Sequence, residues 1–298
     1  MLSEKVHLLK TTSEVGIKIA NFWNTQIERH GEECAEAFYK SIGLNHLPAK
    51  SVDWEGLQLS RDPTEAEKLC IKSISFAQDE GKASVLPILL NARSALIDDA
   101  LEAIKKLTPA TYHELILTVP EQYQEQLRVE IESIFMRGKQ LVDRELSGGK
   151  SQKQSDPTEE DDSELDDLAD LTSSRVANDV QARITASTAR FALLGLTGKA
   201  LWDAVRKDVE DGSTAYIDRT STGLANRTLN FGREREAEDR SDEWDRVEYS
   251  AILDSNVCEP CAADDGETAT SEDELTPAPN PDCAGGDWCR CFHVFIAA

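Results

Sequence analysis

The sequence lacks any long hydrophobic run, because no stretch of its 298 residues approaches the roughly 18 consecutive apolar residues that a membrane span needs. Its first residues, MLSEKVHLLK, show neither the basic and apolar segments nor the cleavage site of a secretory leader. Walker A, HExxH and GxSxG sequences are missing, as is a GxGxxG following a strand. We therefore expect a protein made and kept in the cytoplasm, with no membrane contact, no catalytic residues and no enzymatic activity.

Positive charge is also scarce. The chain has 32 Lys and Arg against 56 Asp and Glu, a formal net charge of −24. Residues 258–298 alone hold nine carboxylates and one arginine. Binding to nucleic acid depends mainly on cationic contacts with phosphate. A DNA partner is therefore possible but is not supported by the charge, and solubility is the simplest role for the acidic surface.

Cysteine is rare until the end of the chain. Of seven cysteines, only Cys34 and Cys70 precede residue 258, so the sequence contains no distributed disulfide framework and fits a reducing compartment. The other five and one histidine crowd into 36 residues that have few helix-forming signals. The candidate ligands are Cys258, Cys261, Cys283, Cys289, Cys291 and His293.

These residue types favour a structural metal site. A CxxC turn offers two thiolates to a tetrahedral ion, and a second pair from a distant loop completes the coordination, so Zn²⁺ is the leading hypothesis. Six candidates for four positions leave at least two spare. A disulfide or redox pair, or reduced thiols that merely pack, remain alternatives. The residues after Cys261 are acidic and turn-prone, which favours a loop over the helix that follows a redox-active CxxC.

The first half of the chain shows helical periodicity. We predict a helical N-terminal domain over 1–146, with helices within 3–42 and over about 62–80, 87–107 and 120–146. Residues 147–164 have no apolar side chain and several carboxylates, so we predict an acidic flexible linker there.

The second half, 165–298, combines helices with a short β segment. Helices are predicted from Leu165 to about Gly195, from Thr197 through Val209, and from Gly212 to about Arg240. Residues 246–253 then alternate with period two, which predicts a strand running into Cys258. A second strand over 287–296 would place Cys289, Cys291 and His293 on one face and Arg290, Phe292, Val294 and Ile296 on the other. The predicted fold class is mainly α with a small C-terminal β, zinc-knuckle-like module, an α+β arrangement in two helical parts.

A polar stretch precedes this module and contains Arg227, Asn230 and Arg233. Charges of both signs at helical spacing usually describe a solvated face. The guanidinium groups could instead hold carboxylates of the cysteine module or of a partner chain.

Taken in order, these features resemble the phage Mu F-type minor head protein family, also called head morphogenesis proteins. The resemblance covers about 171–298 and is carried by a helical region, an N-x-G-R segment, a strand ending in Leu-Asp, a CxxC, a glycine, a proline-rich approach and a terminal CRC. Here these are Asn230, Gly232 and Arg233, then Leu253 and Asp254, Cys258 and Cys261, Gly266, and Cys289 to Cys291.

One position departs from the family pattern. The family commonly ends in His-Pro-x-Cys-Arg-Cys, whereas Gly286 stands where the histidine would be. Cys283, two residues after Pro281, is a candidate replacement ligand.

The resemblance implies a minor capsid component of a tailed phage or prophage, located in the virion at the head interior or portal vertex and in the host cytoplasm during assembly. Its implied partners are the portal protein and a capsid or scaffold protein, in head assembly or DNA packaging and delivery. Two alternatives remain: a DNA-contacting regulator of packaging or ejection, and a virion-carried zinc enzyme or effector.

Overall fold

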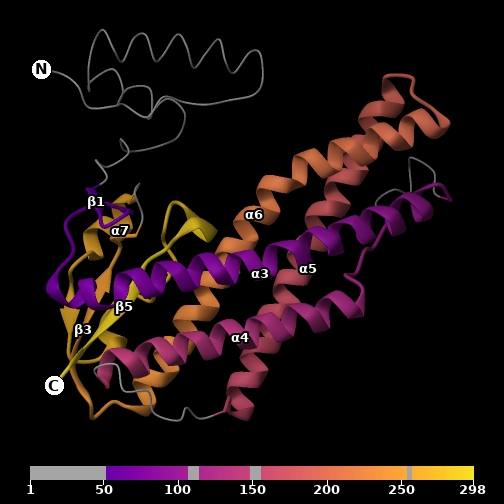
Figure 1. Ribbon diagram of the computed structural model, residues 1–298. Coiled ribbons are helices and arrows are strands. Elements are labelled where there is room, and N and C mark those ends of the chain that lie inside the picture. Colours follow the sequence, from indigo (N-terminus) through magenta and orange to yellow (C-terminus); the bar gives the residue numbers. More distant parts are fainter. Residues whose placement is uncertain (1–51, 107–113, 148–155, 254–256) are drawn as a thin grey trace, which may run out of the picture.

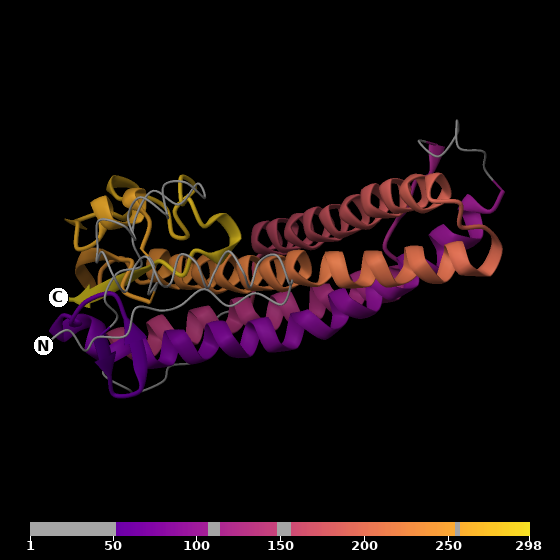
Figure 2. The ribbon, with the colours of Figure 1, turned by 90° about the horizontal axis from the view of Figure 1, so that it is seen from above.

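A computed structural model of the chain describes residues 52–106, 114–147, 156–253 and 257–298. Long helices form an elongated bundle, and a small sheet lies at one end of it (Figures 1 and 2). The prediction of a mainly helical protein with a small C-terminal sheet is confirmed. The predicted helix within 3–42 lies outside the described residues. None of the described helices has both the length and the apolar character needed to cross a bilayer.

Four helices build the bundle: α3 (Glu65–Ile104), α4 (Glu121–Leu146), α5 (Glu159–Leu193) and α6 (Gly198–Asp239). Helices from both predicted domains share one hydrophobic core, because each presents an apolar stripe toward the others. Fully buried members from the four helices are Ile71, Leu96, Ile131, Phe135, Val176, Val180, Val205 and Leu229.

Helix α3 runs without a break where two helices were predicted, and that prediction was wrong. It passes through Gly81 and Pro87. A Cβ on Gly81 would lie 3.1 Å from the Ile134 side chain and 3.2 Å from Ala225, so the glycine gives close helix packing here and does not end the helix. The helix begins at Thr64, whose hydroxyl accepts from the Glu67 backbone N–H while the Glu67 carboxylate accepts from Thr64 N–H.

Helix α5 begins inside the predicted linker, so the linker assignment was wrong for residues 159–164. Thr158 and Asp161 form a reciprocal capping box. The four carboxylates that suggested disorder occupy the first turn, where the positive end of the helix dipole favours them. Residues 148–155 of the predicted linker lie outside the described residues.

Helix α6 is also continuous, although a break at Gly212 was predicted. Gly212 is exposed. A glycine in a helix interior is about 1 kcal/mol less favourable than an alanine, and the packing of the long helix outweighs this cost. Further along, α6 meets α4 at two glycines. A Cβ at Gly232 would lie 2.0 Å from the Phe135 carbonyl oxygen, and one at Gly138 would lie 2.2 Å from the Leu229 carbonyl oxygen. Backbone therefore touches backbone at this crossing.

The sheet has the order β4-β3-β5, with β3 (Trp244–Ser250) antiparallel to both β4 (Thr268–Ala269) and β5 (Phe292–Ala297). The predicted strand pair is thus present with shifted ends. A separate hairpin of β1 (Val52–Trp54) and β2 (Leu57–Leu59) turns through Glu55 and Gly56, both at positive φ. It connects to the region after β3 through a Ser60 N–H to Ile252 carbonyl bond of 3.0 Å.

Strand β5 separates two cores, in agreement with the predicted alternation. Phe292 and Val294 belong to the bundle core, whereas Cys291 and Phe295 belong to a second cluster that contains four buried cysteines. The period-two pattern therefore predicted the two faces correctly, even though regular pairing starts only at residue 292.

Candidate metal centre

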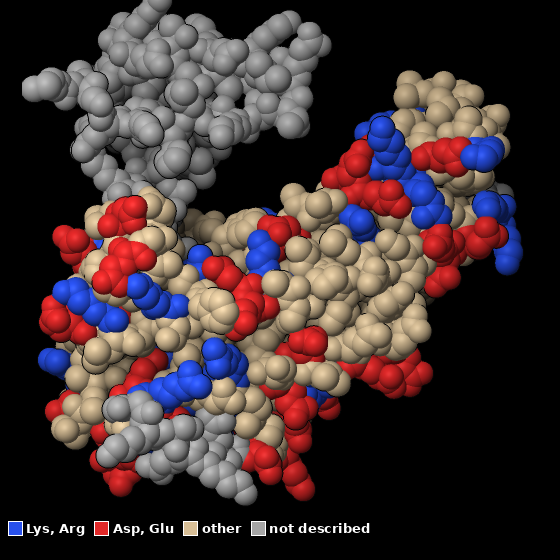
Figure 3. Space-filling model, in the orientation of Figure 1, with Lys and Arg blue, Asp and Glu red and all other residues tan. Residues whose placement is uncertain are grey.

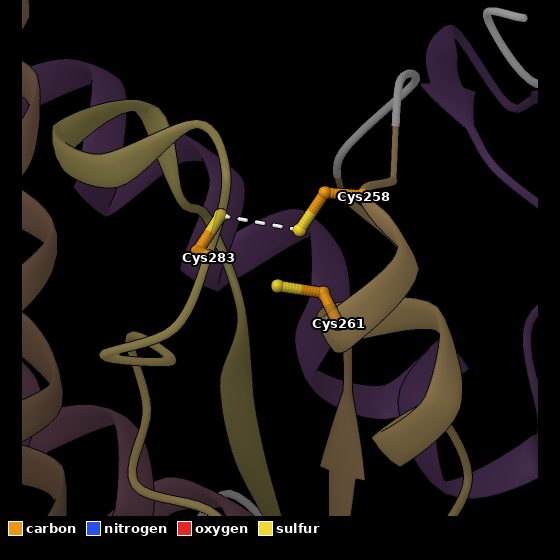
Figure 4. Close-up of side chains that lie close together, drawn as sticks. All are labelled: Cys258, Cys261 and Cys283. Carbon is orange, nitrogen blue, oxygen red and sulfur yellow. Dashed lines mark hydrogen bonds between the residues drawn. The ribbon is translucent and has the colours of Figure 1, made fainter. Parts of the chain in front are cut away.

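Five cysteines meet beside the sheet, brought together from three segments. Cys258 is the N-cap of the short helix α7 (Glu259–Asp264), which carries Cys261. Cys283 lies in the loop before the 3-10 helix η3 (Gly286–Trp288), and Cys289 immediately follows η3. Figure 4 shows Cys258 and Cys261 facing Cys283 across the gap between α7 and this loop.

Two of the sulfur–sulfur distances match the edge of a tetrahedral site. Cys258 Sγ lies 3.6 Å from Cys283 Sγ, and Cys261 Sγ lies 4.0 Å from Cys289 Sγ. Metal–sulfur bonds of 2.3 Å at the tetrahedral angle give sulfur–sulfur edges of about 3.8 Å. These two distances suit edges of a thiolate site around one soft ion, and the sulfurs lie in two groups of three, with no four of them all within 4.8 Å of one another.

The sulfurs form two overlapping groups. Within Cys258, Cys261 and Cys283, and within Cys261, Cys289 and Cys291, every sulfur lies within 4.8 Å of the others. Cys261 belongs to both groups and is fully buried. The arrangement could hold a metal ion, with Cys258, Cys261 and Cys283 on one side and Cys289 or Cys291 completing the set.

The thiols cannot all ionise together without a cation. Hydrogen bonds from the thiols of Cys261, Cys283 and Cys291 lower the pKa of Cys289 strongly. Hydrogen bonds to Cys283 and Cys289 raise the pKa of Cys261 strongly, and the pKa of Cys283 is raised to about 12. Without metal, ionisation is thus favoured at Cys289 and disfavoured at Cys261 and Cys283. Metal binding would therefore release protons.

The residues after Cys261 were expected to form a loop, and that prediction was wrong for residues 262–264, which belong to α7. Pro260 in the first turn of α7 is compatible with a helix start, since the missing N–H is not needed there. Burial raises the pKa of Cys258, but hydrogen bonds from the backbone of Cys261 and Ala284 outweigh it and lower the pKa overall. All six cysteines in the described part of the chain are free thiols.

His293 was predicted as a candidate ligand of the same site, but it lies in neither sulfur group. Its Nδ1 is 2.7 Å from Glu272 Oε1, and its Nε2 is 2.9 Å from the Thr276 carbonyl oxygen. The side chain is only 3 % exposed. Alternation along β5 put His293 on the correct face, but the ring turns toward the loop after β4 and away from the thiols.

Helix α6 positions the cysteine segment through a ladder of side chains. Asn226 Nδ2 donates to the Cys289 carbonyl at 2.7 Å, and Asn230 Nδ2 donates to the Cys291 carbonyl at 2.9 Å. Arg233 Nη2 donates to the His293 carbonyl at 2.7 Å. From Asn226 to Asn230, four helical residues advance about 6 Å, close to the roughly 6.6 Å of two extended residues. The next step, to Arg233, is three residues or about 4.5 Å, and the longer arginine side chain spans the difference. Backbone carbonyls on one edge of the segment are thereby fixed.

Each residue of the N-x-G-R segment therefore has a structural role. Asn230 binds the backbone of the terminal segment, and Gly232 allows α4 to pack closely against α6. Arg233 links the terminal segment to α4, because its two terminal nitrogens also bind Glu145 on α4 at 2.6 and 3.0 Å. Arg233 is only 1 % exposed. Arg227 pairs with Asp287 of the cysteine module at 3.3 Å. Arg227 thus holds a carboxylate of the cysteine module, whereas the carboxylate that pairs with Arg233 lies on α4 and Asn230 binds a backbone carbonyl.

Two carboxylates beside His293 were not predicted from the sequence. Glu234, from α6, and Glu272, from the 3-10 helix η2 (Glu272–Glu274), each bring an oxygen within 4.8 Å of a His293 ring nitrogen and of one another. Burial, followed by the charges of Glu272 and Glu238, raises the pKa of Glu234 to about 8. No sequence spacing connects these residues, which lie 38 and 21 positions apart.

No protein-family model, curated protein or solved structure shows a significant match to this chain.

The face shown in Figure 3 carries acidic and basic side chains intermixed, with no continuous basic surface on it.

Proposed function

We propose that this chain is a minor head or head-morphogenesis protein of a tailed phage or prophage, whose C-terminal zinc-knuckle-like module is stabilised by a structural Zn²⁺ ion. The observation that carries the structural part is the meeting of thiols from α7, the Cys283 loop and the Cys289–Cys291 segment, with two sulfur–sulfur distances of 3.6 and 4.0 Å close to the edge of a tetrahedral site. Zn²⁺ is the usual ion for four thiolates in a short loop-rich segment.

The site suits structure better than catalysis. Catalytic zinc keeps a position open for water, whereas structural zinc is closed by four protein ligands. Here five thiols surround the position, and Cys261, Cys289 and Cys291 are at most 1 % exposed. The proposed role is therefore to lock the fold of residues 244–298, without turnover of any substrate.

The phage assignment is supported by the sequence resemblance and by the way its separate motifs converge. The N-x-G-R segment contacts the CRC segment directly, through Asn230 to Cys291 and Arg233 to His293. These motifs thus form one unit in space. On this proposal the protein sits in the virion near the portal vertex, binds the portal protein and a capsid or scaffold protein, and acts in head assembly or DNA delivery.

Direct DNA regulation is a weaker proposal. Two of the arginines that might have formed a basic patch are used internally: Arg233 is buried against Glu145, and Arg235 pairs with Asp161 and Glu164. The net charge of −24 opposes phosphate binding further.

Metal analysis of single variants tests the structural part. Purified full-length protein is expected to contain one Zn²⁺ per chain, and Cys258→Ser, Cys261→Ser and Cys283→Ser are each expected to lose most of it. Cys70→Ser is the matched control, because this buried cysteine lies on α3 outside both sulfur groups. Equal zinc in all four variants would refute the metal site.

Affinity capture tests the phage part. The full chain is expected to retain the portal protein encoded beside it when the two are co-expressed, and the control is an unrelated portal protein. Failure to bind its own portal, capsid and scaffold proteins would refute the assembly role while leaving the zinc result untouched.

A further inference from the structure

A second group of metal-ligating side chains lies next to the thiols but shares no residue with them. It consists of Glu234 on α6, Glu272 on η2 and His293 on β5. Their ligand atoms all lie within 4.8 Å of one another. Three elements that are distant in sequence therefore bring ligand atoms to one point beside β5.

The tautomer of His293 is fixed by its surroundings. A carbonyl oxygen can only accept, so the 2.9 Å contact with Thr276 requires Nε2 to carry a hydrogen. The other ring nitrogen, Nδ1, lies 2.7 Å from Glu272 Oε1. A contact this short requires either a proton on Nδ1, which gives a His293–Glu272 ion pair, or a cation shared by the nitrogen and the carboxylate. A backbone carbonyl on the far nitrogen is also the usual way in which proteins orient a metal-binding histidine.

Glu234 adds a third acceptor that lacks a counterion. Within the described residues, no hydrogen bond or ion pair reaches its carboxylate, and burial together with the charge of Glu272 disfavours its ionised form. The neighbouring Arg233 is engaged by Glu145 and by the His293 carbonyl through its two terminal nitrogens. A divalent cation at this point would offset the burial of Glu234 and its repulsion from Glu272, and would thereby favour the ionised form of Glu234.

We propose that Glu234, Glu272 and His293 bind a divalent cation at a second site, separate from the thiol centre. Two carboxylates with one imidazole suit a borderline ion such as Mn²⁺, Fe²⁺ or Zn²⁺, whereas the soft thiol site favours Zn²⁺. The ion would fasten η2, which lies in the loop leading to Cys283, to α6 and β5. Its role is to hold the loop that supplies one thiol ligand.

Manganese titration distinguishes this site from the thiol centre, because Mn²⁺ has little affinity for thiolates compared with Zn²⁺. Full-length protein is first given one equivalent of Zn²⁺ and then titrated with Mn²⁺, while free Mn²⁺ is measured by electron paramagnetic resonance. We expect one bound Mn²⁺ per chain. Glu272→Gln is expected to weaken binding by more than the roughly 10–100-fold caused by loss of an outer-shell partner.

Glu274→Gln is the matched control, since Glu274 belongs to the same 3-10 helix but is exposed and absent from the group. It should bind Mn²⁺ like the wild type. Zinc content is measured in the same samples, so a failure of the thiol centre is recognised separately. If Glu272→Gln also loses zinc, the Mn²⁺ affinity of Glu234→Gln is the deciding measurement, because this substitution on α6 leaves η2 intact. Absence of Mn²⁺ binding by the wild type, or equal affinity in Glu234→Gln and Glu274→Gln, would overturn the second site.

Discussion

At the scale of single residues, two glycines decide how closely the helices pack. Gly138 on α4 and Gly232 on α6 each face the backbone of the opposite helix, with room for hydrogen only. Backbone carbonyls cannot move aside as a flexible side chain can. Gly232 is therefore required for the α4–α6 crossing. This contact with the α4 backbone explains why a glycine stands next to Arg233 in the N-x-G-R segment.

Replacing Gly232 by alanine should be strongly destabilising. The new Cβ would stand 2.0 Å from the Phe135 carbonyl oxygen, so α4 and α6 must separate, and we expect a loss of at least about 3 kcal/mol, the upper end for overpacking. Urea unfolding measures the change. Gly212→Ala in the same helix is the control, because its Cβ would meet only the flexible end of Arg183. It should stabilise by up to about 1 kcal/mol. Similar effects at both positions would contradict the close-contact explanation.

Glu67 is a second residue with several structural roles. It caps α3, receives two bonds from Arg61 at 2.7 and 2.8 Å, and accepts from Ser250 Oγ at 2.5 Å. Burial raises the pKa of Glu67, but the hydrogen bonds from Arg61, Ser250 and Thr64 outweigh it and lower the pKa below its usual 4.5. The ionised carboxylate therefore connects the start of α3 to the end of β3.

This lowered pKa predicts acid sensitivity. The unfolded chain binds a proton at Glu67 at a higher pH than the folded chain does, so the stabilisation is present above about pH 4.5 and falls as the pH drops through the folded-state pKa. Glu67→Gln should cost about 2–3 kcal/mol at pH 7, less than the 3–5 of a fully buried pair because Arg61 is 30 % exposed. Thermal unfolding from pH 3 to 7 measures this. A variant whose deficit stayed constant across that range would contradict the ionised role.

At the scale of elements, α6 organises the C-terminal segment through Asn226, Asn230 and Arg233. The sequence indicated this polar stretch but could not identify its hydrogen-bond partners. The partners are backbone carbonyls, which every residue type has, so no residue pattern predicts them. Only the docking of the cysteine segment along α6 shows that the asparagines hold backbone close to the metal centre.

Removing both asparagines should loosen the cysteines without unfolding the bundle. Asn226→Ala with Asn230→Ala leaves two buried carbonyls without donors, at roughly 1–3 kcal/mol each. We expect faster amide exchange over residues 287–297 and weaker zinc binding, with exchange in α3 unchanged. Hydrogen–deuterium exchange with mass spectrometry measures both regions.

Thr228→Ala is the control, since its hydroxyl is buried on α6 without a hydrogen-bond partner among the described residues. The proposed hydrogen-bond ladder would be refuted if amide exchange over residues 287–297 were as slow in the double variant as in the Thr228→Ala control.

At the scale of the whole molecule, the protein has two cores of different kinds. The bundle core joins all four long helices, whereas the smaller core combines Val247, Tyr249 and Phe295 with four buried cysteines. A small apolar cluster provides little hydrophobic stabilisation by itself. We therefore expect the terminal module to depend on its metal and the bundle to depend on its own packing.

Metal removal should accordingly separate the two parts. Chelation of the purified protein is expected to abolish protection of β3 and β5 from amide exchange, while α3 and α4 retain most of theirs and far-ultraviolet circular dichroism stays largely helical. Restoring Zn²⁺ should recover the sheet. Raising the pH toward 8 should strengthen zinc binding, because the protonated thiols of Cys261 and Cys283 must lose their protons to bind. Simultaneous loss of bundle and sheet on chelation would contradict this division.

The sequence by itself determined the helical class, the position of the strand pair, the two faces of β5 and the set of cysteines, because periodicity and residue chemistry are local. It misplaced the breaks in α3 and α6, because Gly81 packs closely against Ile134 and Ala225 and because the packing of the rest of α6 outweighs the cost of the exposed Gly212. It also wrongly continued the linker into residues 159–164, where a capping box starts α5.

Only the tertiary structure separated His293 from the thiols and joined it to Glu234 and Glu272. These three residues come from a helix, a 3-10 turn and a strand, and their proximity follows from the packing of the loop after β4. Local sequence fixes which ligand types are present, whereas the distances that assign them to one centre or another arise from contacts across the fold.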